Sequence, residues 1–163
     1  MLSKNQQPIM ASILDRLIDD APNEQDVKDS HRGLNLRQLR SNVRRDLENL
    51  LNAKLQWQTW PDHLTELDNS LMNYGLRDFS SMPVASLDGR QLLCKQVADT
   101  IKRFEPRFLE VMVETVDNEQ PLDRVLRLKI NALLYAEPEP EYISFDSEVE
   151  PVHLAMIVNE GIL

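Results

Sequence analysis

The sequence predicts an α+β fold, with N-terminal helices followed by a small antiparallel sheet that packs against a long helix. Two observations carry this prediction. Up to residue 104, apolar side chains recur at spacings of three and four, which places them along one face of a helix. From residue 108 onward the spacing changes to two, which is typical of strands with one buried face. Helices first and strands afterwards indicate the α+β class.

The chain is long enough for one domain with its own core, but it carries more polar sequence than that core requires. It has 163 residues, of which 42% are hydrophobic and 28% charged. The polar surplus lies in residues 19–33, where five acidic residues accompany Val27 as the one sizeable apolar residue. We therefore divide the chain into an N-terminal amphipathic helix with an acidic linker, residues 1–33, and a single domain, residues 34–163.

The N-terminal helix is expected over residues 9–18, because its apolar residues form one stripe. The stripe consists of Met10, Ile13, Leu14, Leu17 and Ile18. A stripe of this kind most often packs back onto its own domain. A helix at the end of a tether can also dock on a partner, so both interpretations stay open.

The next helix is expected to begin at Asn35, which has capping-box spacing to Gln38. Its buried face would comprise Leu36, Leu39, Val43, Leu47, Leu50 and Leu51. A second face carries the basic residues Arg37, Arg40 and Arg44. This basic stripe could meet an acidic partner, but part of its charge is ordinary pairing within the helix, since Glu48 follows Arg44 by four residues.

A short helix and a long helix complete the first half of the chain. The short helix should start at Pro61 and end before a left-handed cap at Gly75. Its apolar side would consist of Leu64, Leu67 and Leu71. The long helix should run from an N-cap at Asp88 to Phe104. It should end there because Pro106 disfavours the helical conformation in the residue before it.

Four strands are expected in the second half. They occupy residues 108–114, 125–134, 142–145 and 152–158. In the first strand, the core-facing residues would be Leu109, Val111 and Val113. Residues 118–121 separate the first two runs and read as a hairpin loop. Arg127 and Lys129 of the second strand could pair with glutamates across the hairpin.

The tripeptide Glu105-Pro106-Arg107, between the long helix and the first strand, is the most informative local feature. A glutamate at a helix C-terminus faces the negative end of the helix dipole, a mismatch of about 0.3–1 kcal/mol. Something should compensate, and Arg107 lies two residues on. One interpretation is a corner salt bridge that fixes how the helix leads into the strand. The other is a rigid, charged corner presented to another subunit, because a local rule broken without visible gain often marks a functional site.

Composition argues against several classes of function. The net charge is −9, from 18 basic and 27 acidic residues, so DNA, RNA and anionic lipid surfaces would be repelled. Cys94 is the single cysteine, which excludes an internal disulfide, and no Cys/His spacing indicates a metal site. No cofactor-binding motif is present. Without a signal-like or membrane-spanning apolar run, we expect a cytoplasmic protein that does not insert into a membrane.

A carboxylate-based hydrolase is the alternative from another class. Glycosidases need two carboxyl groups, one of them protonated, at about 5–10 Å. With 27 acidic residues, candidate pairs are unavoidable and carry no information. Arg103 and Arg107 near Glu105 would favour its ionised form, which is wrong for a general acid. We expect no catalytic residue and no enzyme activity.

The ordered set of segments resembles a known family. The segments are Ser12–Leu17, Ser41–Asn52, Ser70–Leu76, Ile101–Arg107 and Leu126–Leu134. Together they resemble the TssE family, small baseplate subunits of the bacterial type VI secretion system. That family is similar in turn to the baseplate wedge protein of contractile phage tails once labelled a lysozyme. The resemblance covers nearly the whole chain, and the order of the segments is more specific than any one of them.

The resemblance implies an assembly role in protein secretion. Members of the family join the wedge subunits TssF and TssG in a baseplate that also contains TssK, docked near the inner membrane. They are thought to template the contractile sheath, made of TssB and TssC, by strand exchange. For this chain, the resemblance implies a wedge-binding motif at Glu105, Pro106 and Arg107 and a second contact at Leu14 and Leu17. The last strand, with Leu154 and Met156, is the candidate for exchange with the sheath.

Overall fold

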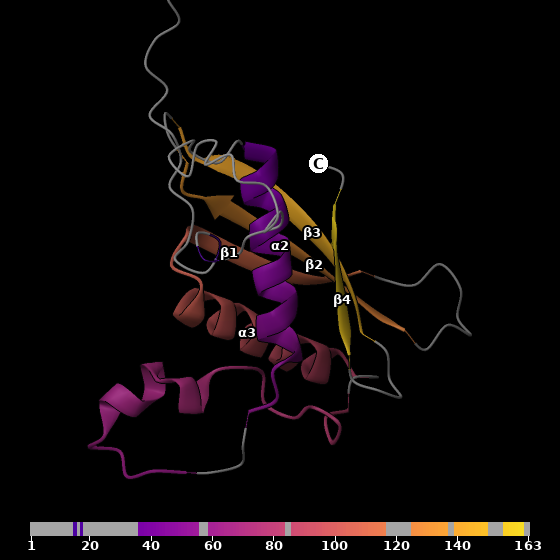
Figure 1. Ribbon diagram of the computed structural model, residues 1–163. Coiled ribbons are helices and arrows are strands. Elements are labelled where there is room, and N and C mark those ends of the chain that lie inside the picture. The colour runs from indigo at the N-terminus through magenta and orange to yellow at the C-terminus, as the bar shows by residue number, and fades with distance from the viewer. Residues whose placement is uncertain are drawn as a thin grey trace, which may run out of the picture.

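A computed structural model describes residues 15, 17, 36–55, 59–83, 86–116, 125–136, 139–149 and 155–161 of the chain. Within these ranges, two α-helices and two short 3-10 helices precede four strands, and Asp15 and Leu17 are also helical (Figure 1). The helices are α2 (Leu36–Asn52), η1 (Thr65–Asn69), η2 (Leu71–Asn73) and α3 (Leu87–Phe104). The strands are β1 (Phe108–Val116), β2 (Leu126–Leu134), β3 (Glu141–Val149) and β4 (Met156–Glu160). The predicted α+β class is confirmed.

The sheet is an antiparallel meander with strand order β1-β2-β3-β4. Both α-helices lie on one face of it: α3 packs against β1 and α2 against β4 (Figure 1). β2 is central, and its inward residues alternate as the sequence predicts. The fully buried ones are Leu128, Ile130, Ala132 and Leu134. The result is a two-layer domain with one core between the helices and the sheet.

The apolar face of α2 is buried as predicted, except at its first turn. Leu36 is half-buried. The buried residues are Leu39, Val43, Leu47, Leu50 and Leu51. The corresponding face of α3 is formed by Leu93, Val97 and Ile101, none of which is exposed. Asn35, the expected first residue of α2, lies outside the described residues.

The start of α3 differs from the prediction. Ser86, not Asp88, is the N-cap: its backbone is extended, and its hydroxyl accepts a hydrogen bond from the Gly89 N–H at 3.1 Å. Both residue types cap helices well, so composition alone did not distinguish them. Asp88 instead lies in the first turn, where its charge suits the helix dipole.

The first strand also differs, because it begins with an irregularity. Phe108 pairs with Leu134 and Glu110 with Leu133, so the register shifts by one residue between them. The shift turns Leu109 outward, where it is 53% exposed, and Phe108 inward. Leu109 was therefore wrongly assigned to the core face, whereas Val111 is buried as expected.

The later strands and the short helix depart from their expected limits. β3 is longer than residues 142–145, and β4 begins at Met156, with residues 152–154 outside the described part. The expected hairpin loop at 118–121 also lies outside it. The segment after Pro61 forms two 3-10 helices with no buried leucine. Leu64 and Leu71 are exposed because this segment projects from the domain instead of packing on it (Figure 1).

Candidate functional site

The Glu105-Pro106-Arg107 corner is where α3 ends and the chain turns into β1. Glu105 is the C-cap of α3, and its N–H donates to the Ile101 carbonyl at 2.8 Å. Pro106 is exposed at the turn. The Tyr135 N–H then donates to the Arg107 carbonyl at 2.8 Å, which extends the β1–β2 pairing back to the corner. The corner is therefore fixed on both sides by backbone hydrogen bonds.

The carboxylate of Glu105 is buried and bound by Arg107 in a two-point contact. Glu105 is only 6% exposed. Arg107 Nε donates to Glu105 Oε1 at 2.6 Å and Arg107 Nη2 to Oε2 at 2.5 Å. Such paired, charge-assisted bonds fix both distance and orientation. The corner salt bridge expected from the sequence is confirmed, and it compensates the glutamate at the negative end of the α3 dipole.

Asp46 of α2 joins this pair and ties the corner to a distant helix. Arg107 Nη2 donates to Asp46 Oδ2 at 2.7 Å across 61 positions in the chain. Asp46 Oδ1 in turn accepts from Arg45, at 3.2 Å from Nε and 2.9 Å from Nη2. The alternation of carboxylates and guanidinium groups leaves each charge with an opposite neighbour. Such a network is specific in geometry but costs desolvation energy, so it favours precision over stability.

The network continues to the N-terminal segment. Arg45 Nη2 donates to Asp15 Oδ1 at 2.5 Å, and the Asp15 side chain is only 5% exposed. Asp15 therefore lies against α2, while nearby Leu17 is 76% exposed. Leu14 lies outside the described residues. The segment is attached to the domain at Asp15, and the proposed partner contacts of Leu14 and Leu17 stay predictions.

Electrostatics raise the pKa of both guanidinium groups in the network. Burial lowers the pKa of Arg107, but the hydrogen bonds and charges of Glu105 and Asp46 outweigh it, so the net pKa rises above its ordinary value. The pKa of Arg45 is raised by its hydrogen bonds to Asp15 and Asp46. Arg107 Nη1 is buried, with no hydrogen-bond partner among the described residues. The described part of the domain thus leaves one buried donor of the corner without a partner.

Tyr74 lies beside the same corner. Its ring meets that of Phe104 edge to face, with centroids 5.4 Å apart. Burial, followed by the negative charges of Asp46 and Glu105, raises the pKa of its hydroxyl. Tyr74 therefore favours the neutral form and packs the segment before Gly75 onto the end of α3.

Met156, the candidate for strand exchange, lies at the outer edge of the sheet, and that edge is already occupied. Asn52 at the end of α2 bonds both backbone groups of Met156: Nδ2 donates to the carbonyl at 2.8 Å, and Oδ1 accepts from the N–H at 2.9 Å. Arg44 donates to the Val158 carbonyl at 3.2 Å. These side chains take the place of a neighbouring strand. Leu154 lies outside the described residues.

The basic stripe of α2 is largely used within the chain. Arg40 forms an ion pair with Glu141 of β3 at 2.5 Å, and Arg44 pairs with Glu48 at 3.1 Å as the four-residue spacing predicts. On the sheet, Arg127 forms an ion pair with Glu148 of β3 at 3.2 Å. These contacts leave less free positive charge for an acidic partner than the sequence pattern indicates.

Sequence reasoning missed Asp46, Arg45 and Asn52 as members of these contacts. Their partners lie between 30 and 104 positions away, at Asp15, Arg107 and Met156. The available signal was the position of Asp46 next to Leu47, on the buried side of an otherwise amphipathic helix. A carboxylate there needs a partner.

The described residues were compared with the chemistry of metal sites and of reactive thiols. No group of three or more His, Cys, Asp or Glu side chains within those ranges could hold a metal ion. Cys94 is half-buried, and burial raises the pKa of its thiol, which disfavours the nucleophilic thiolate. No described helix has the length and apolar character that a membrane span requires.

Comparison with known proteins gives the family. A model of the family described as baseplate wedge protein gp25 matches residues 37–139, which include α2, α3, the corner and the first two strands. The chain belongs to this family of baseplate wedge proteins. It is also similar to a chain in a solved structure titled "The baseplate complex from the type VI secretion system", with 17% identity and a TM-score of 0.47. That match covers 70% of this chain and 96% of the other, and no curated protein matches at the sequence level.

Proposed function

We propose that this chain is the TssE-like subunit of a type VI secretion baseplate, a structural component that serves protein secretion. Membership of the wedge family supports a place in a contractile baseplate. The ordered segments that resemble the TssE family favour the secretion system over a phage tail. In this proposal the chain joins the wedge subunits TssF and TssG, in a baseplate that also holds TssK and docks at the cytoplasmic side of the inner membrane.

The observation that carries the proposal is the construction of the corner. Glu105, Arg107 and Asp46 are locked together by three side-chain hydrogen bonds of 2.5–2.7 Å, while Pro106 stays exposed. A rigid, partly charged corner loses little conformational entropy when a partner binds.

The N-terminal segment would provide a second contact with the wedge. Because Asp15 is fixed on Arg45, the exposed side chain of Leu17 is held near the domain instead of hanging on a free tether. Leu14 and Leu17 would then form part of one apolar contact with a neighbouring subunit.

Templating of the sheath would use the β4 edge at Leu154 and Met156. An incoming strand of TssB or TssC must first displace Asn52 from the backbone of Met156. The displaced hydrogen bonds would be replaced by those of the new strand, so the exchange need not cost much net energy. Asn52 would thus keep the edge closed until a strand arrives.

We also propose that the chain is not an enzyme. Its buried glutamate is fully engaged by Arg107, which suits a structural ion pair and not a proton donor. A peptidoglycan clearance assay with the purified protein would test the hydrolase alternative, and clearance above that of a heat-denatured control would contradict this part of the proposal.

The experiment for the assembly role is co-expression with TssF and TssG, followed by affinity purification through a tag on this chain. We expect both wedge subunits to be recovered with the wild-type chain. Recovery of neither subunit, from a folded and soluble chain, would contradict the proposal.

A further inference from the structure

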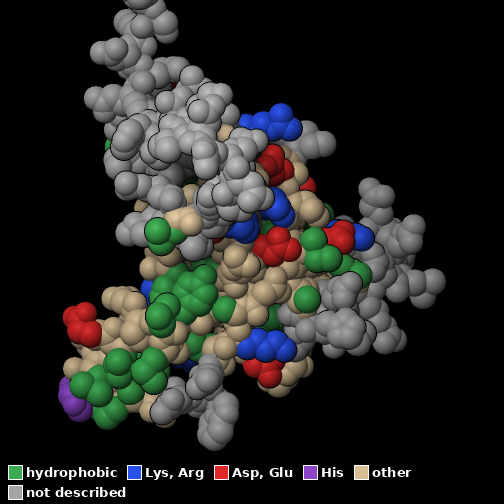
Figure 2. All heavy atoms as spheres, in the orientation of Figure 1, with side chains coloured by type: hydrophobic (Ala, Val, Ile, Leu, Met, Phe, Trp, Pro, Cys, Tyr) green, Lys and Arg blue, Asp and Glu red, His purple; other side chains and the backbone are tan. Residues whose placement is uncertain are grey.

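A projecting arm, residues 59–73, presents apolar side chains that the domain does not cover. The arm contains the two 3-10 helices, which pack chiefly on each other (Figure 1). Its exposed large side chains are Leu64, Leu71 and Met72, and Leu71 is 88% exposed. Figure 2 shows hydrophobic side chains gathered on this projection at the lower left of the molecule. Contiguous apolar surface on a soluble protein often marks a site of interaction with another molecule.

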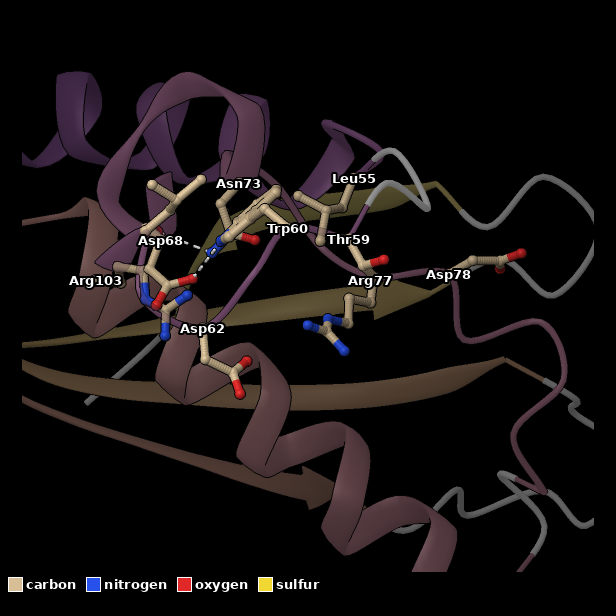
Figure 3. Close-up of a pocket in the computed structure, with 10 residues that line it drawn as sticks. Leu55, Thr59, Trp60, Asp62, Asp68, Asn73, Arg77, Asp78 and Arg103 are labelled. Carbon is tan, nitrogen blue, oxygen red and sulfur yellow. Dashed lines mark hydrogen bonds between the residues drawn. The ribbon is translucent and has the colours of Figure 1, made fainter. Parts of the chain in front are cut away.

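Hydrogen bonds within the arm fix its internal shape, although the arm buries few of its side chains. Asn73 Nδ2 donates to the Asp68 carbonyl at 2.8 Å, and the Ser70 hydroxyl donates to the Leu67 carbonyl at 2.7 Å. Trp60 Nε1 donates to Asp68 Oδ1 at 3.3 Å, which closes the arm on itself (Figure 3). An arm built with these bonds is prepared for binding, because less freedom is lost when a partner arrives.

The base of the arm is anchored to the domain at Gly75. This residue has φ +119°, and a Cβ there would lie 2.3 Å from the Ala53 carbonyl oxygen. The close approach allows the Leu76 N–H to donate to that carbonyl at 2.9 Å and the Leu55 N–H to donate to the Leu76 carbonyl at 3.1 Å. The two ends of the arm are therefore held together at the domain surface.

A cavity of about 670 Å³ lies between the arm and the end of α3. The arm side carries Asp62 and Asp68, and the opposite side carries Arg77 and Arg103. Asp62 and Arg77 extend into the open space (Figure 3). The volume suits one or two large side chains of a partner. Its charges favour a cation on the arm side.

The charge of the arm defines the chemistry of its partner. Between Lys54 and Arg77 the sequence contains no Lys or Arg, but it contains Asp62, Glu66 and Asp68. All three carboxylates are exposed, as are three large apolar side chains of the arm. A surface that combines apolar side chains with carboxylates is complementary to an apolar stripe flanked by cations. A second copy of this arm would bring like charges together.

We propose that the arm is a docking surface for a partner helix that presents an apolar stripe flanked by Lys and Arg. Leu71 and Met72 would contact the stripe, Asp62 and Glu66 would pair with the flanking cations, and the cavity beside Trp60 would receive one side chain of the partner. This surface uses none of the residues Glu105, Pro106 and Arg107 of the corner, and it does not depend on the assembly role proposed above.

The test uses the full chain and two synthetic helical peptides with the same leucine stripe, one flanked by lysines and the other by glutamates. Binding is measured by calorimetry and by tryptophan emission. We expect the lysine peptide to bind at least about tenfold more tightly than the glutamate peptide, and more weakly as salt is raised. Equal binding of the two peptides, or binding of neither, would overturn the proposal.

Three variants locate the binding. Leu71→Asp should lower the affinity for the lysine peptide at least about tenfold. Leu87→Asp is the matched control, because it changes an exposed leucine at the opposite end of α3 and should leave binding unchanged. Glu66→Lys leaves Asp62 and Asp68 in place, so it should reduce the preference for the lysine peptide without changing the exposed apolar side chains of the arm. If Leu71→Asp is folded by circular dichroism and binds like the wild type, or if Glu66→Lys leaves the preference for the lysine peptide undiminished, the arm is not the docking surface.

Sedimentation of the chain without peptide tests whether a second copy of the chain binds to the arm. We expect a monomer whose state does not depend on Leu71. A dimer that Leu71→Asp dissociates would mean that a second copy occupies the arm, which would overturn the proposed partner.

Discussion

Replacing Arg107 by methionine alone should destabilise the domain strongly. The change leaves the Glu105 carboxylate, whose side chain is 8% exposed, without its two-point partner and removes one bond from Asp46. Breaking a buried ion pair by removing one partner costs about 3–5 kcal/mol. Domains of this size are stable by only about 5–15 kcal/mol, so the loss should be a large part of the total.

The double variant Glu105→Leu/Arg107→Met should recover most of that loss. It removes both buried charges together and fills the space with apolar groups, which is often neutral or stabilising. Asp46 keeps its contacts with Arg45. We expect the double variant to lie within about 2 kcal/mol of the wild type.

The assay is urea unfolding followed by far-ultraviolet circular dichroism, with both single variants and the double variant forming a cycle. Arg127→Met is the matched control. Its ion pair with Glu148 is more open to water, with side chains 37% and 47% exposed, so it should cost about 1 kcal/mol or less. The reasoning fails if Arg107→Met costs no more than Arg127→Met, or if the double variant costs the sum of the two single changes.

Three further predictions concern the surroundings of the corner and the sheet edge. Because the pKa of Tyr74 is raised above its ordinary value of 10.0, its contribution to stability is full below that pH and is lost as the pH rises through the folded pKa. Above about pH 10 the urea midpoint of Tyr74→Phe should therefore fall less than that of wild type, and midpoints that fall in parallel would contradict this prediction. Asn52→Ala should cost about 1–3 kcal/mol, because it removes two hydrogen bonds to Met156 and one to the Glu48 carbonyl. The Met156 amide should exchange faster in Asn52→Ala than in Asn52→Asp, which keeps an acceptor, and equal exchange in the two variants would contradict the edge contact. Gly75→Ala should lower the free energy of unfolding in urea by at least about 1–3 kcal/mol, because alanine would combine a positive φ with a clash against the Ala53 carbonyl. A change within experimental error would contradict this and show that the base of the arm adjusts freely.

The spacing of hydrophobic residues was sufficient to predict the helix layer and the sheet layer of the fold. The repeat in α2 and α3 and the alternation in β2 report burial directly, so the core residues on these elements were predicted well. The same rule failed at Leu109, because a one-residue shift in register reverses the side chains and leaves no mark in the local pattern. It also failed after Pro61. Three leucines at helical spacing predicted a helix with a buried side, but the segment forms two 3-10 helices in which no leucine is buried.

The candidate site was only partly visible in the sequence. The Glu105–Arg107 pair could be predicted because both residues belong to one turn and the helix dipole requires compensation. Asp46 and Asn52 could not, because their partners are brought near only by the packing of α2 across the sheet. Contacts between residues far apart in sequence depend on the tertiary fold, which local propensity does not encode.

The most direct test of the central claim is a cross-link from the corner inside an assembled baseplate. A photoreactive amino acid would replace the exposed Pro106, and a second chain would carry it in place of Leu87 as the control. If the corner is held by a neighbouring protein, irradiation of cells that express the whole secretion gene cluster should join position 106, but not position 87, to TssF or TssG. A folded chain that assembles into the baseplate and yields no wedge cross-link from position 106 would contradict the claim.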